Sequence, residues 1–283
     1  VHGIVYRTMN SIYLRLYRLF HSKAWHSEDR QDTRLFDKVA ALLERMNDEE
    51  QAVCLCLLED FVRIDDSQYK PLIRRAVDQM PVPEKKHLIV APASSPEDLD
   101  ARKLKSGDGV AYDAEIHIKQ HTAYAGTTTH RTSDYRVMPP RAPAAAAKVH
   151  FLLVDDYSGT GDTAALAIKA VRDAHPDATV SAAFVAAQDA AVSRLTALVD
   201  CGIGVGRLLN KGVTDSQRLK DKPRALEVLG SCSDRLGEPK EMRLGYGDSE
   251  AVVTLKRTPN NTFPLFWSTR PVEGDEWPAP FPR

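Results

Sequence analysis

The chain has little of several features whose abundance would define a protein class. None of its uncharged runs approaches the ~18–20 apolar residues that a bilayer-spanning helix needs, so we expect no membrane segment. Its 15 glycines and 17 prolines are near average usage, which excludes collagen-like and low-complexity chains. Arginines interrupt residues 1–23 in place of an unbroken apolar stretch. We therefore expect no signal peptide and a cytoplasmic location.

Neither sign of charge is in excess, because 38 Lys and Arg stand against 39 Asp and Glu. Such a balance gives no global nucleic-acid footprint, although it is compatible with local basic patches. The chain has four cysteines, of which only Cys54 and Cys56 lie close in sequence. Their spacing matches neither a CxxC redox motif nor a zinc knuckle, so we expect buried, reduced thiols.

The spacing of apolar residues changes near Pro81 and Pro83. Before these prolines it is helical; after them, short apolar runs alternate with helical patterns, which predicts a parallel α/β sheet. The expected strands are residues 87–91, 109–113, 151–154, 179–185, 203–208 and 251–255. We therefore predict a helical region over residues 1–83, an α/β core over 84–240 and a C-terminal extension over 241–283.

Residues 116–148 show little periodicity, and a stretch this long inside a domain is usually functional or mobile. Within residues 117–148 a single acid, Asp134, accompanies five basic residues. These are Lys119, Arg131, Arg136, Arg141 and Lys148. A positive loop suits closure over a diphosphate. A solvated loop, or a contact with a partner or nucleic acid, is the alternative.

The most informative window is residues 151–163, FLLVDDYSGTGDT. An apolar strand delivers Asp155 and Asp156 at its carboxyl end, where open α/β sheets bind ligands. A small loop then opens a helix, and its backbone N–H groups, with the helix dipole behind them, favour a phosphate. Thr160 and Thr163 add hydroxyl donors. The two carboxylates can accept hydrogen bonds from vicinal hydroxyls, and the loop beside them can bind a phosphate. Together they predict a site for a ribose 5-phosphate.

This window resembles the phosphoribosyl pyrophosphate (PRPP) motif of type I phosphoribosyltransferases, in which four apolar residues precede two acids and a glycine loop rich in Thr and Ser. The resemblance implies a Rossmann-like parallel core with a C-terminal hood, PRPP or nucleotide binding, and Mg²⁺ carried on the diphosphate. It assigns the ribose hydroxyls to Asp155 and Asp156. It assigns the 5′-phosphate to Ser158, Gly159, Thr160, Gly161, Asp162 and Thr163.

Two positions depart from that pattern. Purine-salvage members have an aspartate that serves the base where this chain has Gly159. Asp162 stands where Gly, Ser or Lys is usual, and a carboxylate beside a phosphate is unfavourable unless it points away or binds Mg²⁺. Ordinary salvage of hypoxanthine or guanine is therefore not expected.

A closer resemblance is to the divergent bacterial group called PRTase-CE. Its two motifs are here residues 155–161 (DDYSGTG) and 259–267 (PNNTFPLFW). Members occur in bacterial conflict systems, including retrons, in which an effector lies beside a reverse transcriptase and its nucleic-acid product. The resemblance thus implies a defence-linked role, with a reverse transcriptase and its RNA or DNA product as partners.

Further site residues are expected by their position in the resemblance. The candidates for a pyrophosphate contact are Ser94, Ser95, Lys105, Ser106 and Arg131, with ordinary turns as the alternative. Phe266 and Trp267 lie beyond the sheet, where a hood stacks on a base, or they pack in the core. Glu115, His117, His121 and His130 follow no regular ligand spacing, so we expect no metal site built from the protein alone.

The first 25 residues interleave basic and aromatic side chains, and no acid precedes Glu28. Such a segment suits a nucleic-acid or protein contact, and an ordinary amphipathic helix is the alternative. Homo-oligomerisation stays open.

Two hypotheses on function follow. The first is a transfer at ribose C1 with Mg²⁺-pyrophosphate as leaving group or nucleophile. The second is a catalytically silent nucleotide or PRPP sensor, or an assembly subunit, held in a reverse transcriptase–nucleic-acid complex; Gly159 and Asp162 favour it. A receiver domain would leave the hydroxyl-rich loop unexplained. A Walker A loop is excluded, because Asp162 stands in place of its lysine.

Overall fold

The computed structural model describes residues 2–25, 34–84, 86–101, 106–140, 142–143 and 149–283. Contacts within the chain divide it into two units, of which one is Ile64–Asn210 and the other combines Val1–Arg63 with Lys211–Arg283. Each unit is described by itself. In the part of the chain that the structure describes, no helix is both long and apolar enough to cross a membrane.

The unit of residues 64–210 is built on a five-stranded, wholly parallel sheet with the order β3-β2-β4-β5-β6. Its strands are β2 (His87–Pro92), β3 (Thr128–Arg131), β4 (Val149–Ser158), β5 (Thr179–Gln188) and β6 (Ile203–Leu209). Its helices are α4 (Asp66–Asp78), α5 (Pro96–Asp100), α6 (Ser106–Gln120), α7 (Asp162–Ala174) and α8 (Asp189–Thr196). The predicted parallel α/β core is confirmed.

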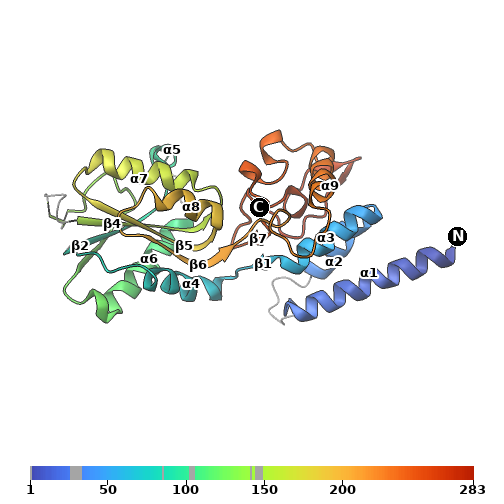
Figure 1. Ribbon diagram of the computed structural model, residues 1–283, viewed down its shortest axis with the longest axis horizontal. Coiled ribbons are helices and arrows are strands. Elements are labelled where there is room, and N and C mark those ends of the chain that lie inside the picture. The colour runs from blue at the N-terminus through green and yellow to red at the C-terminus, as the bar shows by residue number, and fades with distance from the viewer. Residues whose placement is uncertain (1, 26–33, 85, 102–105, 141, 144–148) are drawn as a thin grey trace. The chain divides into compact units, whose positions relative to one another are not determined.

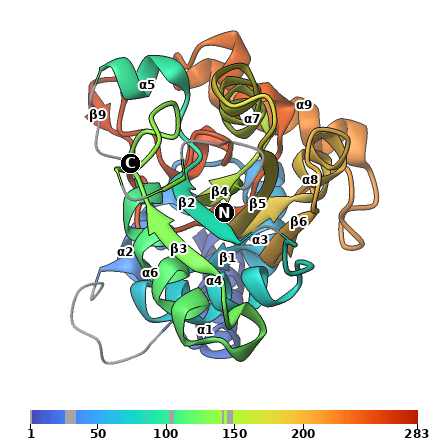
Figure 2. The same cartoon turned by 90° about the vertical axis from the view of Figure 1, so that its left-hand side faces the viewer.

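Helices cover both faces of this sheet. α4 and α6 pack on one face, and α7 and α8 pack on the other (Figures 1 and 2). Strands that are buried on both faces read as continuous apolar runs, which is why residues 151–154 and 179–185 were predictable as strands. From β2 the chain leads to β3 on one side, whereas β4 leads to β5 and β6 on the other. The gap between β2 and β4 is therefore the topological switch point of the sheet.

The other unit joins the N-terminal helices to the C-terminal segment. Its main helices are α1 (His2–Ser22), α2 (Leu35–Glu44), α3 (Asp48–Asp60) and α9 (Lys222–Arg235), and its short strands are β1 (Val62–Arg63), β7 (Val253–Thr254), β8 (Pro271–Val272) and β9 (Asp275–Glu276). Phe61 stacks on Phe281 with ring centroids 4.5 Å apart and meets the edge of Phe266 at 4.9 Å. Residues from both ends of the chain thus share one core.

The units differ from the predicted segments 1–83, 84–240 and 241–283. α4 belongs with the sheet, on which it packs, rather than with the helices before it. α9 belongs with the N-terminal helices, since the guanidinium of Arg235 on α9 pairs with the carboxylate of Glu50 on α3 at 2.8 Å. Prolines such as Pro81 and Pro83 indicate where a regular element ends. They do not indicate on which unit the helix before them packs.

Two predictions of secondary structure are wrong. Residues 109–113 lie in helix α6 instead of a strand, because a short apolar run does not distinguish a strand from a buried helix segment. Residues 116–148 are not one irregular loop, because they include the end of α6 and the edge strand β3. Arg141 and Lys148 of the predicted basic loop lie outside the described residues.

The aromatic core predicts a large effect of truncating Phe266, whose side chain is fully buried. Phe266→Ala should lower the free energy of unfolding by about 3–5 kcal/mol, measured by urea denaturation, because it leaves a cavity beside Phe61. Leu14→Ala is the control: Leu14 is 49% exposed, and its loss should change stability by no more than about 0.5 kcal/mol. Equal effects of the two substitutions would contradict this account of the core.

Candidate functional site

The acid pair of the sequence motif stands at the carboxyl end of β4, beside the switch point. Asp155 is paired in register with Phe184 of β5, and both carboxylates are partly exposed. The backbone N–H of Asp156 donates to Oδ1 of Asp155 at 2.9 Å. The strand therefore presents two adjacent carboxylates at the edge where parallel sheets take ligands.

Helix α4 contributes a contact to this pair that the sequence analysis missed. The buried hydroxyl of Tyr69, in the first turn of α4, donates to Oδ2 of Asp156 at 3.3 Å. In the sequence, Tyr69 is one member of an apolar helical stripe, and nothing in that pattern distinguishes a tyrosine that packs from one whose hydroxyl reaches a partner. This hydrogen bond orients the carboxylate of Asp156 toward α4.

Helix α6 begins against the other carboxylate. A Cβ added to Gly107 would lie 3.1 Å from Oδ1 of Asp155 and 3.1 Å from Cβ of Pro92. A side chain here would displace these neighbours by a few tenths of an ångström, so the glycine favours this close approach. The positive end of the helix dipole thereby lies beside Asp155. The predicted pyrophosphate residue Ser106 is the first residue of this turn, whereas Lys105 lies outside the described residues.

The loop after β2 lies next to the end of β4. The N–H of Ala93 donates to the carbonyl of Val154 at 2.8 Å. Ser94 is buried, and its carbonyl accepts the hydroxyl of Tyr135 at 2.6 Å. Ser95 caps α5 by accepting the N–H of Asp98. Ser94 and Ser95 thus lie in the loop after β2 with partners of their own, and their role at a pyrophosphate stays a prediction.

Arg131, the fifth predicted pyrophosphate residue, has partners on α6. Arg131 lies on the edge strand β3, where its Nε pairs with Glu115 at 3.0 Å and its guanidinium covers the ring of Tyr112 at 5.5 Å. These contacts hold the side chain against α6. A role for Arg131 at the pyrophosphate stays a prediction, and its Nε would have to leave Glu115 to serve there.

The proposed phosphate loop turns from β4 into α7 at Gly161. This residue has φ +80°, a left-handed conformation that favours glycine, and a Cβ there would lie 3.2 Å from Cγ of Leu195. Helix α7 starts at the next residue, so its free N–H groups open beside the loop. The residues from Ser158 to Thr163 thus form one strand–turn–helix junction, as predicted.

Asp162, the unusual residue of the loop, has two partners. Its Oδ2 accepts the hydroxyl of Thr160 at 2.6 Å, and its Oδ1 forms an ion pair with Arg194 of α8. The Thr160 hydrogen bond, together with the Arg194 guanidinium, lowers the pKa of the Asp162 carboxyl against the opposing effect of burial. Arg194 also donates to the carbonyl of Thr160 at 3.3 Å. The acid is thereby tied to a neighbouring cation that the motif does not contain.

Tyr157 lies between the acid pair and the loop, and its hydroxyl is buried. Among the buried side-chain polar atoms of the described residues, only Oη of Tyr157 and Nε of Arg74 lack a hydrogen-bond partner. Burial raises the pKa of Tyr157, so the phenol stays neutral. An unpartnered hydroxyl of this kind carries a desolvation cost in the absence of a ligand.

The second motif, residues 259–267, forms a network within its own unit. The hydroxyl of Thr262 donates to the carbonyl of Val253 at 2.6 Å, and Nε1 of Trp267 donates to the carbonyl of Thr262 at 2.6 Å. Phe266 is fully buried in the core, so packing is its role and no face remains for a base. Trp267 is half-buried under the guanidinium of Arg283 at 5.1 Å, and its stacking role stays a prediction.

All four cysteines are free. Cys54 and Cys232 are buried, and burial raises the pKa of both thiols. Cys56 and Cys201 are half-buried. The expected burial is therefore confirmed for two of the four thiols, and their reduced state stays a prediction.

Comparison with known proteins gives one family. A family model described as PRTase-CE matches residues 41–283. No curated protein matches the chain. A solved structure of the AQ2163 protein from Aquifex aeolicus is similar over 67% of this chain and 87% of its own, with 13% identity and a TM-score of 0.32, a level of agreement that carries no argument.

Two buried tyrosines beside the site should respond in opposite directions to loss of the hydroxyl. Tyr157→Phe removes an unpartnered polar atom and should raise the free energy of unfolding by about 1 kcal/mol. Tyr135→Phe should lower it by about 1–3 kcal/mol, because the Ser94 carbonyl loses its donor. Thermal unfolding without ligand measures both. A loss of stability in Tyr157→Phe would show that its hydroxyl has a partner.

Proposed function

The chain belongs to the PRTase-CE family, and from this membership we propose that it binds PRPP or a nucleotide and catalyses a reaction at ribose C1. Family membership makes the chain phosphoribosyltransferase-like. The observation that carries the finer proposal is that one strand–turn–helix junction combines the acid pair with the Gly161-capped start of α7. A sugar with vicinal hydroxyls at one end and a phosphate at the other matches both parts.

Each part has a proposed role. Asp155 and Asp156 accept hydrogen bonds from the ribose hydroxyls, and Tyr69 orients the second carboxylate. The N–H groups at the start of α7 and the hydroxyl of Thr160 hold the 5′-phosphate. Ser94, Ser95 and Ser106 flank the switch point, where the diphosphate of PRPP, with its Mg²⁺, would lie.

The proposed reaction breaks the bond between ribose C1 and the diphosphate oxygen while an acceptor nitrogen forms a bond to C1. The bonding electrons leave with the Mg²⁺-diphosphate, and positive charge develops on the ribose ring. In the reverse direction, pyrophosphate attacks C1 of a nucleotide and the base leaves. The protein supplies position and electrostatic stabilisation, and no covalent nucleophile is needed.

Asp162 shapes how the loop would take a phosphate. Without ligand, its carboxylate already accepts the Thr160 hydroxyl, and Arg194 neutralises it. A phosphate that enters the loop competes for the same hydroxyl and the same guanidinium. Binding therefore requires an exchange of partners, in which the phosphate replaces the carboxylate of Asp162.

The same observation favours the second candidate function, a sensor without turnover. The Thr160 hydroxyl is released only when a ligand displaces the carboxylate of Asp162. Such a loop suits a protein that binds its ligand strongly without converting it. Incubation with PRPP, Mg²⁺ and a panel of bases and nucleotides, followed by mass spectrometry, separates the two. New N-glycosidic products or nucleotide breakdown support the enzyme, whereas binding without products supports the sensor.

The proposed setting is bacterial defence, with a reverse transcriptase and its RNA or DNA product as partners. Exposed apolar, aromatic and basic residues on α1 support a contact surface: Leu14 is 49% exposed, Tyr17 55%, and the side chain of Arg15 49%. Co-expression with a neighbouring reverse transcriptase tests this proposal. Failure of the two proteins to purify together would contradict it.

The site assignment predicts a loss of affinity for PRPP. Asp156→Asn and Thr160→Ala should each weaken binding about tenfold or more, or at least about 1.4 kcal/mol, in calorimetric titration with Mg²⁺-PRPP. Asp173→Asn and Thr196→Ala are matched controls, because both side chains lie on exposed helix surfaces, on α7 and α8. Full affinity in the first two variants would make the assignment wrong.

The exchange of partners at Asp162 predicts effects of opposite sign. Asp162→Asn should strengthen the binding of PRPP or a nucleoside monophosphate about three- to tenfold, because a negative charge beside the phosphate is removed. Arg194→Ala should weaken it by a similar factor. The control is Arg172→Ala, since Arg172 pairs with Asp200 in the same exposed manner. Weaker binding in Asp162→Asn would show that the carboxylate itself contacts the ligand or its metal.

A further inference from the structure

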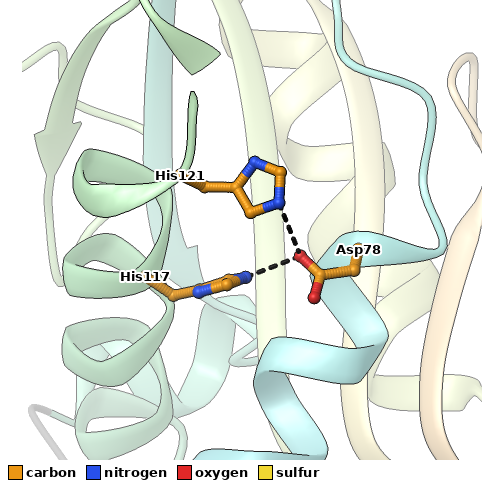
Figure 3. Close-up of side chains that lie close together, drawn as sticks. All are labelled: Asp78, His117 and His121. Carbon is orange, nitrogen blue, oxygen red and sulfur yellow. Dashed lines mark hydrogen bonds and ion pairs between the residues drawn. The ribbon is translucent and has the colours of Figure 1, made fainter. Parts of the chain in front are cut away.

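Three side chains with metal-binding atoms converge where α4 ends beside the end of α6 (Figure 3). Asp78 is the last residue of α4, His117 lies in the last turn of α6, and His121 directly follows that helix. Nε2 of His117 lies 2.6 Å from Oδ1 of Asp78, and Nε2 of His121 lies 3.6 Å from the same oxygen. Both imidazoles therefore point at one carboxylate from the neighbouring helix.

The spacing of these atoms suits a divalent transition metal. One ligand atom from each residue lies within 4.8 Å of the others. In a tetrahedral zinc site with bonds of about 2.0–2.1 Å, ligand atoms are about 3.3 Å apart. The His121–Asp78 distance is close to that value, and the His117–Asp78 pair must open by less than an ångström. Two imidazoles and a carboxylate are donors that Zn²⁺ and its neighbours in the first transition row accept.

The cluster is open on one side, so an ion has a route to it. The side chain of His117 is 12% exposed, that of His121 36% and that of Asp78 44%. Three protein ligands leave a coordination position that water can fill. Among the described residues, this is the group of His, Cys, Asp and Glu side chains whose arrangement meets the distance requirement for a metal.

The protonation of His121 sets a condition for binding. Its Nδ1 accepts the N–H of Ala123 at 3.2 Å, so without metal the ring proton of the neutral form sits on Nε2, toward Asp78. Coordination through Nε2 displaces that proton and places one on Nδ1, at the expense of the long Ala123 hydrogen bond. Metal binding through Nε2 therefore requires the other tautomer of His121 and the loss of this hydrogen bond.

We propose that Asp78, His117 and His121 form a binding site for a divalent transition metal, with Zn²⁺ as the best match. The site lies away from the carboxyl edge of the sheet. The first turn of α4 carries Tyr69, which bonds Asp156, and the first turn of α6 packs Gly107 on Asp155. A metal would join the opposite ends of these two helices and so fix the pair that flanks the acid pair.

The test uses the full-length, tag-free protein after treatment with a chelator. Zn²⁺ is titrated in competition with a chromophoric chelator, and Co²⁺ binding is followed by its visible absorption. We expect one ion per chain. His117→Ala, His121→Ala and Asp78→Asn should each weaken the binding at least tenfold, and circular dichroism should show that the variants are folded. Zn²⁺ should raise the melting temperature of the parent chain but not of these variants.

Two histidine variants serve as controls. His21→Ala removes an exposed imidazole of the other unit and should leave affinity unchanged. His130→Ala tests the rival pair, in which Nε2 of His130 lies 3.5 Å from Nδ1 of His87. No binding by the parent chain, or a loss that follows His130 rather than His117, would overturn the proposal. The binding of PRPP is measured separately with Mg²⁺ alone, so failure of either proposal leaves the other standing.

Discussion

The parallel pairing of β2 with β4 is the interaction on which the candidate site depends. It runs from His87 opposite Val149 to Pro92 opposite Val154, and the hydrogen bond from Ala93 to Val154 extends it by one step. Because the strand order reverses between these two strands, the segments that follow them diverge instead of covering each other. The acid pair, the start of α6 and the loop after β2 share this one edge as a result.

The charges at this edge suit the proposed uptake of a ligand together with a cation. Asp155 and Asp156 are two adjacent carboxylates, and the third acid, Asp162, is paired with Arg194. Carboxylates alone repel a diphosphate, whereas a diphosphate that carries Mg²⁺ brings its own positive charge. The helix dipoles of α6 and α7 also favour a negatively charged ligand at this edge, since both helices begin there.

The sequence predicts the sheet better than it predicts the surroundings of the sheet. Strands buried on both faces are continuous apolar runs, and the motif of residues 151–163 has a fixed order of strand, turn and helix. The contacts of Tyr69 and Arg194 come from other elements, α4 and α8, and no local pattern reveals which distant residue a side chain meets. These contacts arise from tertiary packing.

The wrong prediction of a strand at residues 109–113 concealed the group formed by Asp78, His117 and His121. Residues 109–113 read as a strand, and this reading hides the helical register by which His117 precedes His121 by about one turn. With α6 in place, the two imidazoles stand one turn apart, and Asp78 completes the group from a helix that the sequence assigned to another domain. Of the four residues first considered, Glu115 pairs instead with Lys119 and Arg131, and His130 with His87.

The order of the two units along the chain has a consequence for biosynthesis. Residues 64–210 are continuous, so this unit has all its parts as soon as Asn210 has left the ribosome. The other unit needs β1 near residue 62 to meet β7 near residue 253, and its aromatic core needs Phe281. Its helices before residue 64 must therefore wait for part of their core until Phe281 has been translated. During synthesis, the helical segment before residue 64 is thus separated from its core partners while all of residues 64–210 are made.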